Sequence, residues 1–161
     1  MYKLIKAEKE RWRFQELFNS YIVELSQYNP ALAEHKDKFG DYLPEEVHEY
    51  FNNPCKKPYL IKLGKDYAGF VVFSRPDAED GDDGCDIYIE EMFVDKPFRR
   101  RGTASAVSSD YLAENGGRVC GLCVLKGNED ALGFWTGFFE KRGIETEQLD
   151  GDDVWLIKAR I

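Results

Sequence analysis

The sequence predicts an α/β fold built around one mixed sheet of about seven strands. An apolar run over residues 87–94 leads through a short basic turn into a helical pattern over 103–115, and then into a second apolar run over 118–125. This strand–helix–strand order makes the two strands parallel, because a parallel pair needs a long crossover connection. Two further pairs of β-rich runs are each joined by a short polar turn, which is typical of antiparallel hairpins.

Composition limits the class of protein. Residues 1–161 have the length of one domain, and a hydrophobic share of 43% is enough for a sizeable core. The net charge of −8 argues against nucleic acid and anionic membranes as partners. We find no signal-like segment and no run of apolar residues long enough to span a bilayer. We therefore expect a cytoplasmic protein whose four cysteines are reduced.

The N-terminal third predicts one short strand and two helices. Residues 2–6 favour a strand, and apolar residues at helical spacing predict an amphipathic helix over 8–27. A polar loop is expected over residues 31–41. A second, short helix begins at Pro44, a residue suited to the first turn, and stops near Asn52.

The middle of the chain predicts a hairpin followed by an acidic connection. Strands are expected over 58–63 and 67–74. Residues 77–86 carry six acidic side chains, but a cysteine stands where a calcium-binding loop needs its glycine. Beyond the strand over 118–125, a helix begins after Asn128 and ends at Gly143. The chain then closes with a hairpin of residues 144–149 and 154–160.

The turn after the central strand has the features of a phosphate-binding site. Pro97 ends the strand, three arginines follow, and Gly102 precedes the helix. The first turn of a helix presents free backbone N–H groups, and the helix dipole adds positive character there. This geometry binds a phosphate or pyrophosphate. The sequence matches neither the P-loop nor the dinucleotide-binding fingerprint.

This turn resembles the acetyl-CoA site of the GNAT N-acetyltransferase superfamily. The family signature [RQ]-x-x-G-x-[GA] corresponds to Arg99, Gly102 and Ala104, and residues 90–94 resemble the family's fourth strand. The resemblance extends over residues 58–144. It implies a GNAT-like acyl-CoA N-acyltransferase fold, with a twisted mixed sheet of about seven strands and helices on both faces.

The same resemblance implies an acetyl-CoA-dependent enzyme. An acetyl group would pass from acetyl-CoA to a primary amine of a small molecule, by direct transfer in a ternary complex. No metal is implied, and a homodimer is compatible with it. Backbone groups of the central strand would pair with the pantetheine, and the basic turn would hold the pyrophosphate. The residues expected at the coenzyme are Met92, Phe93, Val94, Arg99, Arg100, Arg101, Gly102, Thr103, Ala104, Asn128 and Trp135.

Two glutamates are candidates for the general base. Glu90 and Glu91 alternate along the central strand, so one of them should face the site, and a β-bulge would change which. Glu90 is favoured, because it is similar in position to the acid of the aminoglycoside-acetyltransferase branch. Tyr88 lies two residues before Glu90, so its side chain should point to the same side of the strand, where it would line the acceptor pocket.

The sequence departs from the family pattern at the general acid. Many members carry a tyrosine on the last helix to protonate the coenzyme thiolate. Here Trp135 stands at that position, or Phe139 in a second alignment, and neither has a hydroxyl group. This departure keeps an alternative open, a non-catalytic acyl-CoA-binding module. We expect no metal or redox pair at Cys120 and Cys123, because residues three apart in a strand point to opposite faces.

Overall fold

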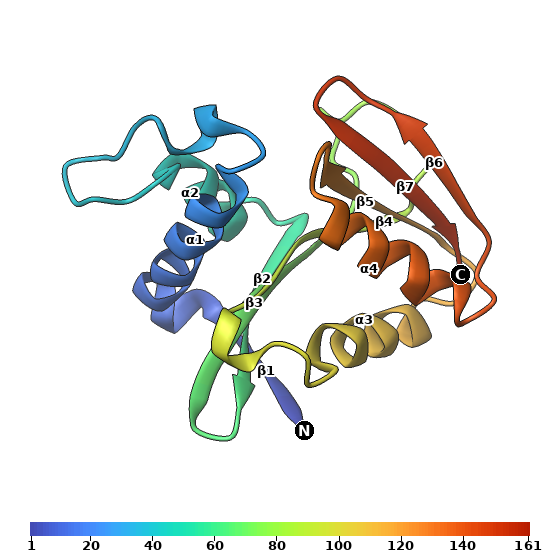
Figure 1. Ribbon diagram of the computed structural model, residues 1–161, viewed down its shortest axis with the longest axis horizontal. Helices are drawn as coiled ribbons and strands as arrows, with labels where there is room; N and C mark the ends of the chain where they lie inside the picture. Colours follow the sequence, from blue (N-terminus) through green and yellow to red (C-terminus); the bar gives the residue numbers. More distant parts are fainter.

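The computed structural model describes residues 1–161 and confirms the mixed α/β fold (Figure 1). One sheet of seven strands has the spatial order β1-β2-β3-β4-β5-β7-β6. All neighbouring strands pair antiparallel except β4 and β5, which pair in parallel as predicted. The strands are β1 (Tyr2–Lys6), β2 (Lys56–Leu63), β3 (Asp66–Ser74), β4 (Ile87–Val94), β5 (Val119–Leu125), β6 (Thr146–Asp150) and β7 (Val154–Arg160).

Helices cover both faces of the sheet. The first pair, α1 and α2, packs with one face in an apolar cluster that includes Phe14, Phe18 and Phe70. The second pair, α3 and α4, packs on the other face around Val71 and Phe138. No helix is long and apolar enough to cross a membrane. The helices are α1 (Arg11–Leu25), α2 (Pro44–Asn52), α3 (Thr103–Glu114) and α4 (Glu129–Glu140), with short 3-10 turns η1 (Ala7–Glu10), η2 (Pro30–Ala33) and η3 (Lys96–Phe98).

The first helix is shorter than its periodicity predicts. A 3-10 turn of four residues precedes it, and α1 ends at Leu25. Asn29 is extended because it precedes Pro30, and a residue before proline is driven away from helical geometry. The chain therefore turns between Ser26 and Tyr28, where the Tyr28 N–H donates to the carbonyl of Leu25. The η2 turn occupies part of the predicted polar loop.

The sheet opens between β4 and β5. The two strands are in register only at Ile87 with Cys120 and at Tyr88 with Gly121, and beyond this point they diverge (Figure 1). Gly121 allows the close approach, since a Cβ there would stand 2.8 Å from the Tyr88 ring. An apolar strand in the middle of a sheet is usually buried on both faces. Cys123 is instead exposed, at the part of β5 that has diverged from β4.

Candidate active site

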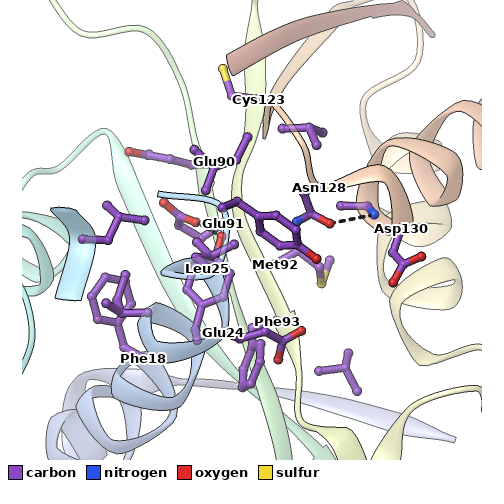
Figure 2. A pocket seen from close by; sticks show the side chains of 18 of the residues that line it. Phe18, Glu24, Leu25, Glu90, Glu91, Met92, Phe93, Cys123, Asn128 and Asp130 are labelled. Carbon is purple, nitrogen blue, oxygen red and sulfur yellow. Dashed lines mark hydrogen bonds between the residues drawn. The ribbon is translucent and has the colours of Figure 1, made fainter. Parts of the chain in front are cut away.

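A cavity of about 460 Å³ occupies the opening between β4 and β5. Most of its lining is apolar and comes from α1, β4, β5 and α4. Figure 2 shows Glu90, Glu91 and Met92 following one another along β4, across from Cys123 and Asn128. A second hollow of about 320 Å³ shares Glu90, Glu91 and Cys123 with it. The two glutamates therefore lie where two openings of the protein meet.

Both glutamates face the cavity, so the prediction that one of them would face away is wrong. In the β3–β4 register, Glu91 pairs with Val72 and Ile89 with Phe73, while Glu90 has no partner. Glu90 is the extra residue of a β-bulge, and a bulge interrupts the regular alternation of side chains. Tyr88 lines the second hollow, next to Glu90.

The carboxylate of Glu90 is held by a cation. Its Oε1 lies 2.6 Å from the ammonium Nζ of Lys56, a residue of β2, and both side chains are mostly buried. Its other oxygen is buried without a hydrogen-bond partner. Glu90 therefore already has a cationic partner within the protein.

Glu91 has a different environment. The hydroxyl of Tyr21 donates to its Oε2 at 2.6 Å, and the hydroxyl of Tyr50 lies 3.0 Å from its Oε1. Burial raises the pKa of Glu91 to about 7, and the negative charges of Glu46 and Glu90 act in the same direction. The two tyrosine hydrogen bonds lower the pKa but do not offset burial. Glu91 is thus a carboxyl group that exchanges its proton near neutrality.

The edge of β4 that faces the cavity is open. Met92, Phe93 and Val94 pair with β3 on one side, and on the other side β4 has no strand partner beyond Tyr88. An open edge of this kind can accept an extended ligand as an added strand. The carbonyl of Val94 is already used, since it accepts a hydrogen bond from Nε of Arg99 at 2.7 Å.

The basic turn presents a run of free backbone donors. None of the N–H groups of residues 100–105 donates a hydrogen bond within the protein. Arg100 and Gly102 both have a positive φ, of 61° and 75°. A Cβ on Gly102 would meet no protein atom within 4 Å, so the space beside this glycine is open. Free amides at the start of α3 can bind an anionic group.

The three arginines of the turn have separate surroundings. Arg99 lines the main cavity, and its guanidinium lies 2.6 Å from a carboxylate oxygen of Glu24 on α1. Arg100 is exposed. Arg101 is exposed as well and lines a different hollow together with Gly102 and Thr103. The positive charge of Arg99 is therefore partly neutralised before any phosphate binds, while the other two arginines remain available.

The predicted residues of α4 lie on the wall of the cavity. The side-chain oxygen of Asn128 accepts a hydrogen bond from the Ala131 N–H at 3.1 Å and caps the helix. Trp135 is buried and lines the cavity with Asn128 and Ala104, whereas Phe139 lies in the core. No hydroxyl group comes from this helix to the cavity.

Several functional residues escaped the sequence analysis. Tyr21 belongs to the apolar stripe of α1, which indicated packing, and Tyr50 and Glu46 lie on α2 without any motif. Tyr28 follows α1 and lines the cavity near Asn128. A Cβ on Gly127, the neighbour of Asn128, would lie 3.8 Å from the Tyr28 ring. A tyrosine after a helix gives no signal by itself, because only the tertiary fold brings it to the β5–α4 loop.

A protein whose twisted sheet opens beside a turn of free backbone amides has the features of a transferase that uses coenzyme A. The acetyltransferase (GNAT) family model matches residues 14–139. The chain therefore belongs to the GNAT family and is an acetyl-CoA-dependent acetyltransferase, as the signature at the basic turn predicted. A search of curated proteins finds no match. No group of three or more His, Cys, Asp or Glu side chains is arranged to hold a metal ion.

Solved structures of acetyltransferases share the fold. An acetyltransferase from Thermus thermophilus has a TM-score of 0.65 at 18% identity, with 99% of this chain and 97% of that chain covered. An N-acetyltransferase from Staphylococcus aureus Mu50 has a TM-score of 0.65 at 15% identity, with 98% of each chain covered. The diaminobutyrate acetyltransferase of Paenibacillus lautus, solved with L-2,4-diaminobutyric acid and coenzyme A, has a TM-score of 0.62 at 18% identity, with 99% and 93% covered. At these identities the likeness concerns the fold alone.

Proposed function

We propose that the protein transfers the acetyl group of acetyl-CoA directly to the primary amine of a small molecule, in a ternary complex. The observation that carries this proposal is the carboxyl group of Glu91, which faces the cavity with a pKa raised to about 7 by burial. Most amines are protonated at neutral pH and must lose a proton before they can attack a thioester. A base with a pKa near the working pH is best suited to that step.

The lining of the cavity supports a cationic acceptor with an apolar body. Five acidic side chains and a single arginine line it, and the acids at Glu46 and Asp130 form no ion pair. The α1 side of the cavity is apolar, with Phe18, Ile22 and Leu25 on the helix. An ammonium group is attracted to the acidic lining, and a hydrocarbon segment is favoured against this wall. A cavity of about 460 Å³ suits a small molecule.

Direct transfer is supported by the state of the one thiol in the cavity. A two-step mechanism through an acetylated cysteine would require Cys123 as a thiolate. The Cys123 side chain is exposed where the sheet opens, but the surrounding protein partly desolvates its thiol, which raises the pKa of Cys123, and the negative charges of Glu91, Asp83 and Glu90 raise it further. A thiol kept protonated is a poor nucleophile, so the amine itself attacks the acetyl carbonyl.

We assign the general base to Glu91 rather than to Glu90, which the sequence favoured. Glu90 is engaged by the ammonium of Lys56 at 2.6 Å, so its carboxyl group already has a cationic partner within the protein. Glu91 is bound only by tyrosine hydroxyls, and these can stay bound whether or not the carboxyl holds a proton. Glu91 accepts a proton from the ammonium group, the neutral amine then forms the C–N bond, and the C–S bond breaks as the thiolate leaves.

We assign the general acid to Tyr28. Only two hydroxyl groups line the cavity, those of Tyr21 and Tyr28, and Tyr21 donates to Glu91. The hydroxyl of Tyr28 makes no hydrogen bond within the protein, and its ring lies beside the loop that leads to Asn128. It would give its proton to the departing coenzyme thiolate and regain one from water. A tyrosine after α1 would thus replace the hydroxyl that α4 lacks.

An amine panel tests the proposed function. The purified chain is incubated with acetyl-CoA and single amines, and release of the free thiol is followed together with the mass of the acetylated product. Apolar primary amines and diamines should react faster than amino acids of net negative charge, and L-2,4-diaminobutyric acid belongs in the panel. Binding of acetyl-CoA is measured separately by calorimetry. Binding without acetylation of any amine would contradict the proposal and favour a non-catalytic acyl-CoA-binding module.

A further inference from the structure

The carboxyl group of Glu91 is one end of a hydrogen-bonded chain whose other end is an exposed carboxyl group on α2. Oε1 of Glu91 lies 3.0 Å from the hydroxyl oxygen of Tyr50, and the same hydroxyl oxygen lies 2.8 Å from Oε1 of Glu46. Glu46 and Tyr50 are four residues apart on α2, so they share one face of that helix. One hydroxyl group therefore joins two carboxyl groups on different elements.

The two hydrogen bonds of the Tyr50 hydroxyl can form together only if one of the two carboxyl groups carries a proton. A tyrosine hydroxyl has a single hydrogen and can donate it to one carboxylate at a time. The other carboxyl group must then be protonated and donate its hydrogen to the tyrosine oxygen. Otherwise the tyrosine oxygen and a carboxylate oxygen would face each other with no hydrogen between them. The Tyr50 side chain is 1% exposed, so water does not compete for its hydroxyl. Two ionised carboxylates around one buried oxygen would repel each other.

The hydrogen-bonded chain runs from a half-buried carboxyl group to an exposed one. Glu91 is half-buried in the wall of the cavity, Tyr50 is buried, and Glu46 is exposed on α2, where it also lines the cavity. The other titratable and charged groups near Glu91 offer no such route. Tyr21 bonds only to Glu91, Glu90 is held by Lys56, and Glu24 by Arg99. Cys123 donates no hydrogen bond. The ammonium of Lys56 lies 5.5 Å from the centre of the Tyr50 ring and is engaged with Glu90.

We infer that Glu46 and Tyr50 form a proton-release path for Glu91, in which the two carboxyl groups share one proton across the Tyr50 hydroxyl. This inference rests on the proposed function, with Glu91 as the base. When acetyl-CoA and the amine fill the cavity, they displace water from beside Glu91, and the exposed Glu46 offers its proton a way to solvent. Glu91 passes the proton to the Tyr50 oxygen while Tyr50 passes its own hydrogen to Glu46, and Glu46 releases it to solvent. Tyr50 stays neutral, no electrons move, and Glu91 is again a carboxylate.

The first test needs no substrate. The infrared band of protonated carboxyl groups is titrated in the full-length protein and in variants. Glu91→Gln should abolish the band that titrates near neutral pH. Glu46→Gln should move its midpoint to lower pH, because a negative charge near Glu91 is lost. Tyr50→Phe should move it to higher pH, because a hydrogen bond to the carboxylate is lost. Glu45→Gln is the matched control: this neighbouring glutamate is exposed on the same helix and makes no hydrogen bond.

The second test uses an amine that the panel identifies. Glu46→Gln should lower kcat roughly tenfold in weak buffer, and increasing concentrations of a small buffer such as imidazole should restore it. The kcat of the wild type and of Glu45→Gln should not depend on buffer. A purely structural role of Glu46 would not be rescued by a proton carrier. If Glu46→Gln matches Glu45→Gln in the infrared titration or in the buffer dependence, the proton-release path is wrong. Absence of any acetylated amine would overturn the proposed function, while the infrared titration would still decide whether the two carboxyl groups are coupled.

Discussion

Lys56 and Glu90 form an ion pair across the sheet, with 2.6 Å between the ammonium nitrogen and a carboxylate oxygen. They come from β2 and β4, on either side of β3, and the bulge at Glu90 is what turns this side chain toward Lys56. The ion pair engages the carboxyl group of Glu90, although this residue lies next to Glu91. Two adjacent glutamates thus have different chemistry because one has a cation beside it and the other has tyrosine hydroxyls.

The first prediction separates the two glutamates in catalysis. Glu91→Gln should lower kcat by about a hundredfold to ten-thousandfold, since this is the usual contribution of a general base. It should also remove the acidic limb of the pH–rate profile, which we expect near pH 7 in the wild type from the pKa of Glu91. Glu90→Gln should cost much less. Steady-state kinetics with an amine from the panel measure both variants, and calorimetry shows whether acetyl-CoA still binds. A larger loss in Glu90→Gln would return the base to the residue that the sequence favoured.

The second prediction concerns stability and pH. Burial raises the pKa of Glu91 from 4.5 to about 7, so the folded state holds this proton more tightly than the unfolded state. Ionised Glu91 therefore destabilises the fold, and stability declines as pH rises from 4.5 to about 7. Glu91→Gln removes this penalty, which is on the order of 1–3 kcal/mol. Urea unfolding should show the variant to be more stable than the wild type at about pH 8 and equal to it at about pH 4.

Glu90→Gln serves as the control for this measurement. It removes the ion pair with Lys56 and should not stabilise the protein at high pH. An equal gain in both variants would mean that general repulsion between acidic groups, rather than the burial of Glu91, limits stability at high pH.

The order of the elements could be predicted because each has a strong local pattern. The alternation and β-branched residues of the strands, the helical spacing on α1, and Asn128 and Gly143 at the limits of the last helix are all features of neighbouring residues. The phosphate-binding turn could be predicted for the same reason, since a strand, a proline, a glycine and a helix follow one another. The resemblance to the GNAT family then supplied the expectation that the coenzyme lies along the central strand and the basic turn.

The chemistry of the site could not be predicted in the same way. The bulge at Glu90 depends on the register between β3 and β4, and the sequence of β4 alone does not contain it. The environment of Glu91 comes from Tyr21 on α1 and Tyr50 on α2, which are 70 and 41 residues away in the chain. On their own helices these tyrosines are indistinguishable from packing residues.

The third prediction tests the phosphate-binding turn. Gly102→Val should weaken acetyl-CoA binding much more than it weakens folding, because its side chain would project into the open space beside the free amides. Gly143→Val is a matched control, since Gly143 also has a positive φ, of 63°, with no atom within 4 Å of its Cβ, and lies just beyond the end of α4. Both variants should lose about 1–2 kcal/mol of stability from backbone strain. Thermal melting with acetyl-CoA separates them: Gly143→Val should gain the stabilisation of the wild type, about 2.7 kcal/mol at a hundredfold excess over Kd. Equal stabilisation of Gly102→Val would show that the phosphates bind elsewhere.

The fourth prediction tests direct transfer. Cys123→Ala should keep kcat within a few-fold of the wild type, because this thiol is held protonated by burial and by nearby carboxylates. Initial rates at varied concentrations of both substrates should give intersecting lines in double-reciprocal plots. Mass spectrometry of the protein with acetyl-CoA alone should show no acetylated enzyme. Parallel lines together with an acetylated Cys123 would establish a covalent intermediate instead.

The last prediction concerns the general acid. Tyr28→Phe should lower kcat by about tenfold to a hundredfold and leave the KM for acetyl-CoA nearly unchanged, because the ring keeps its place and only the hydroxyl is lost. Tyr67→Phe is the control, since this hydroxyl donates to Glu10 outside the cavity and should not affect turnover. A second variant tests the idea of replacement: adding Trp135→Tyr to Tyr28→Phe should restore part of the lost turnover, because it supplies a hydroxyl from α4, on the cavity wall where many family members carry one. If Tyr28→Phe turns over as fast as the wild type, the thiolate leaves without a proton from this residue, and the position of Tyr28 beside the β5–α4 loop serves packing alone.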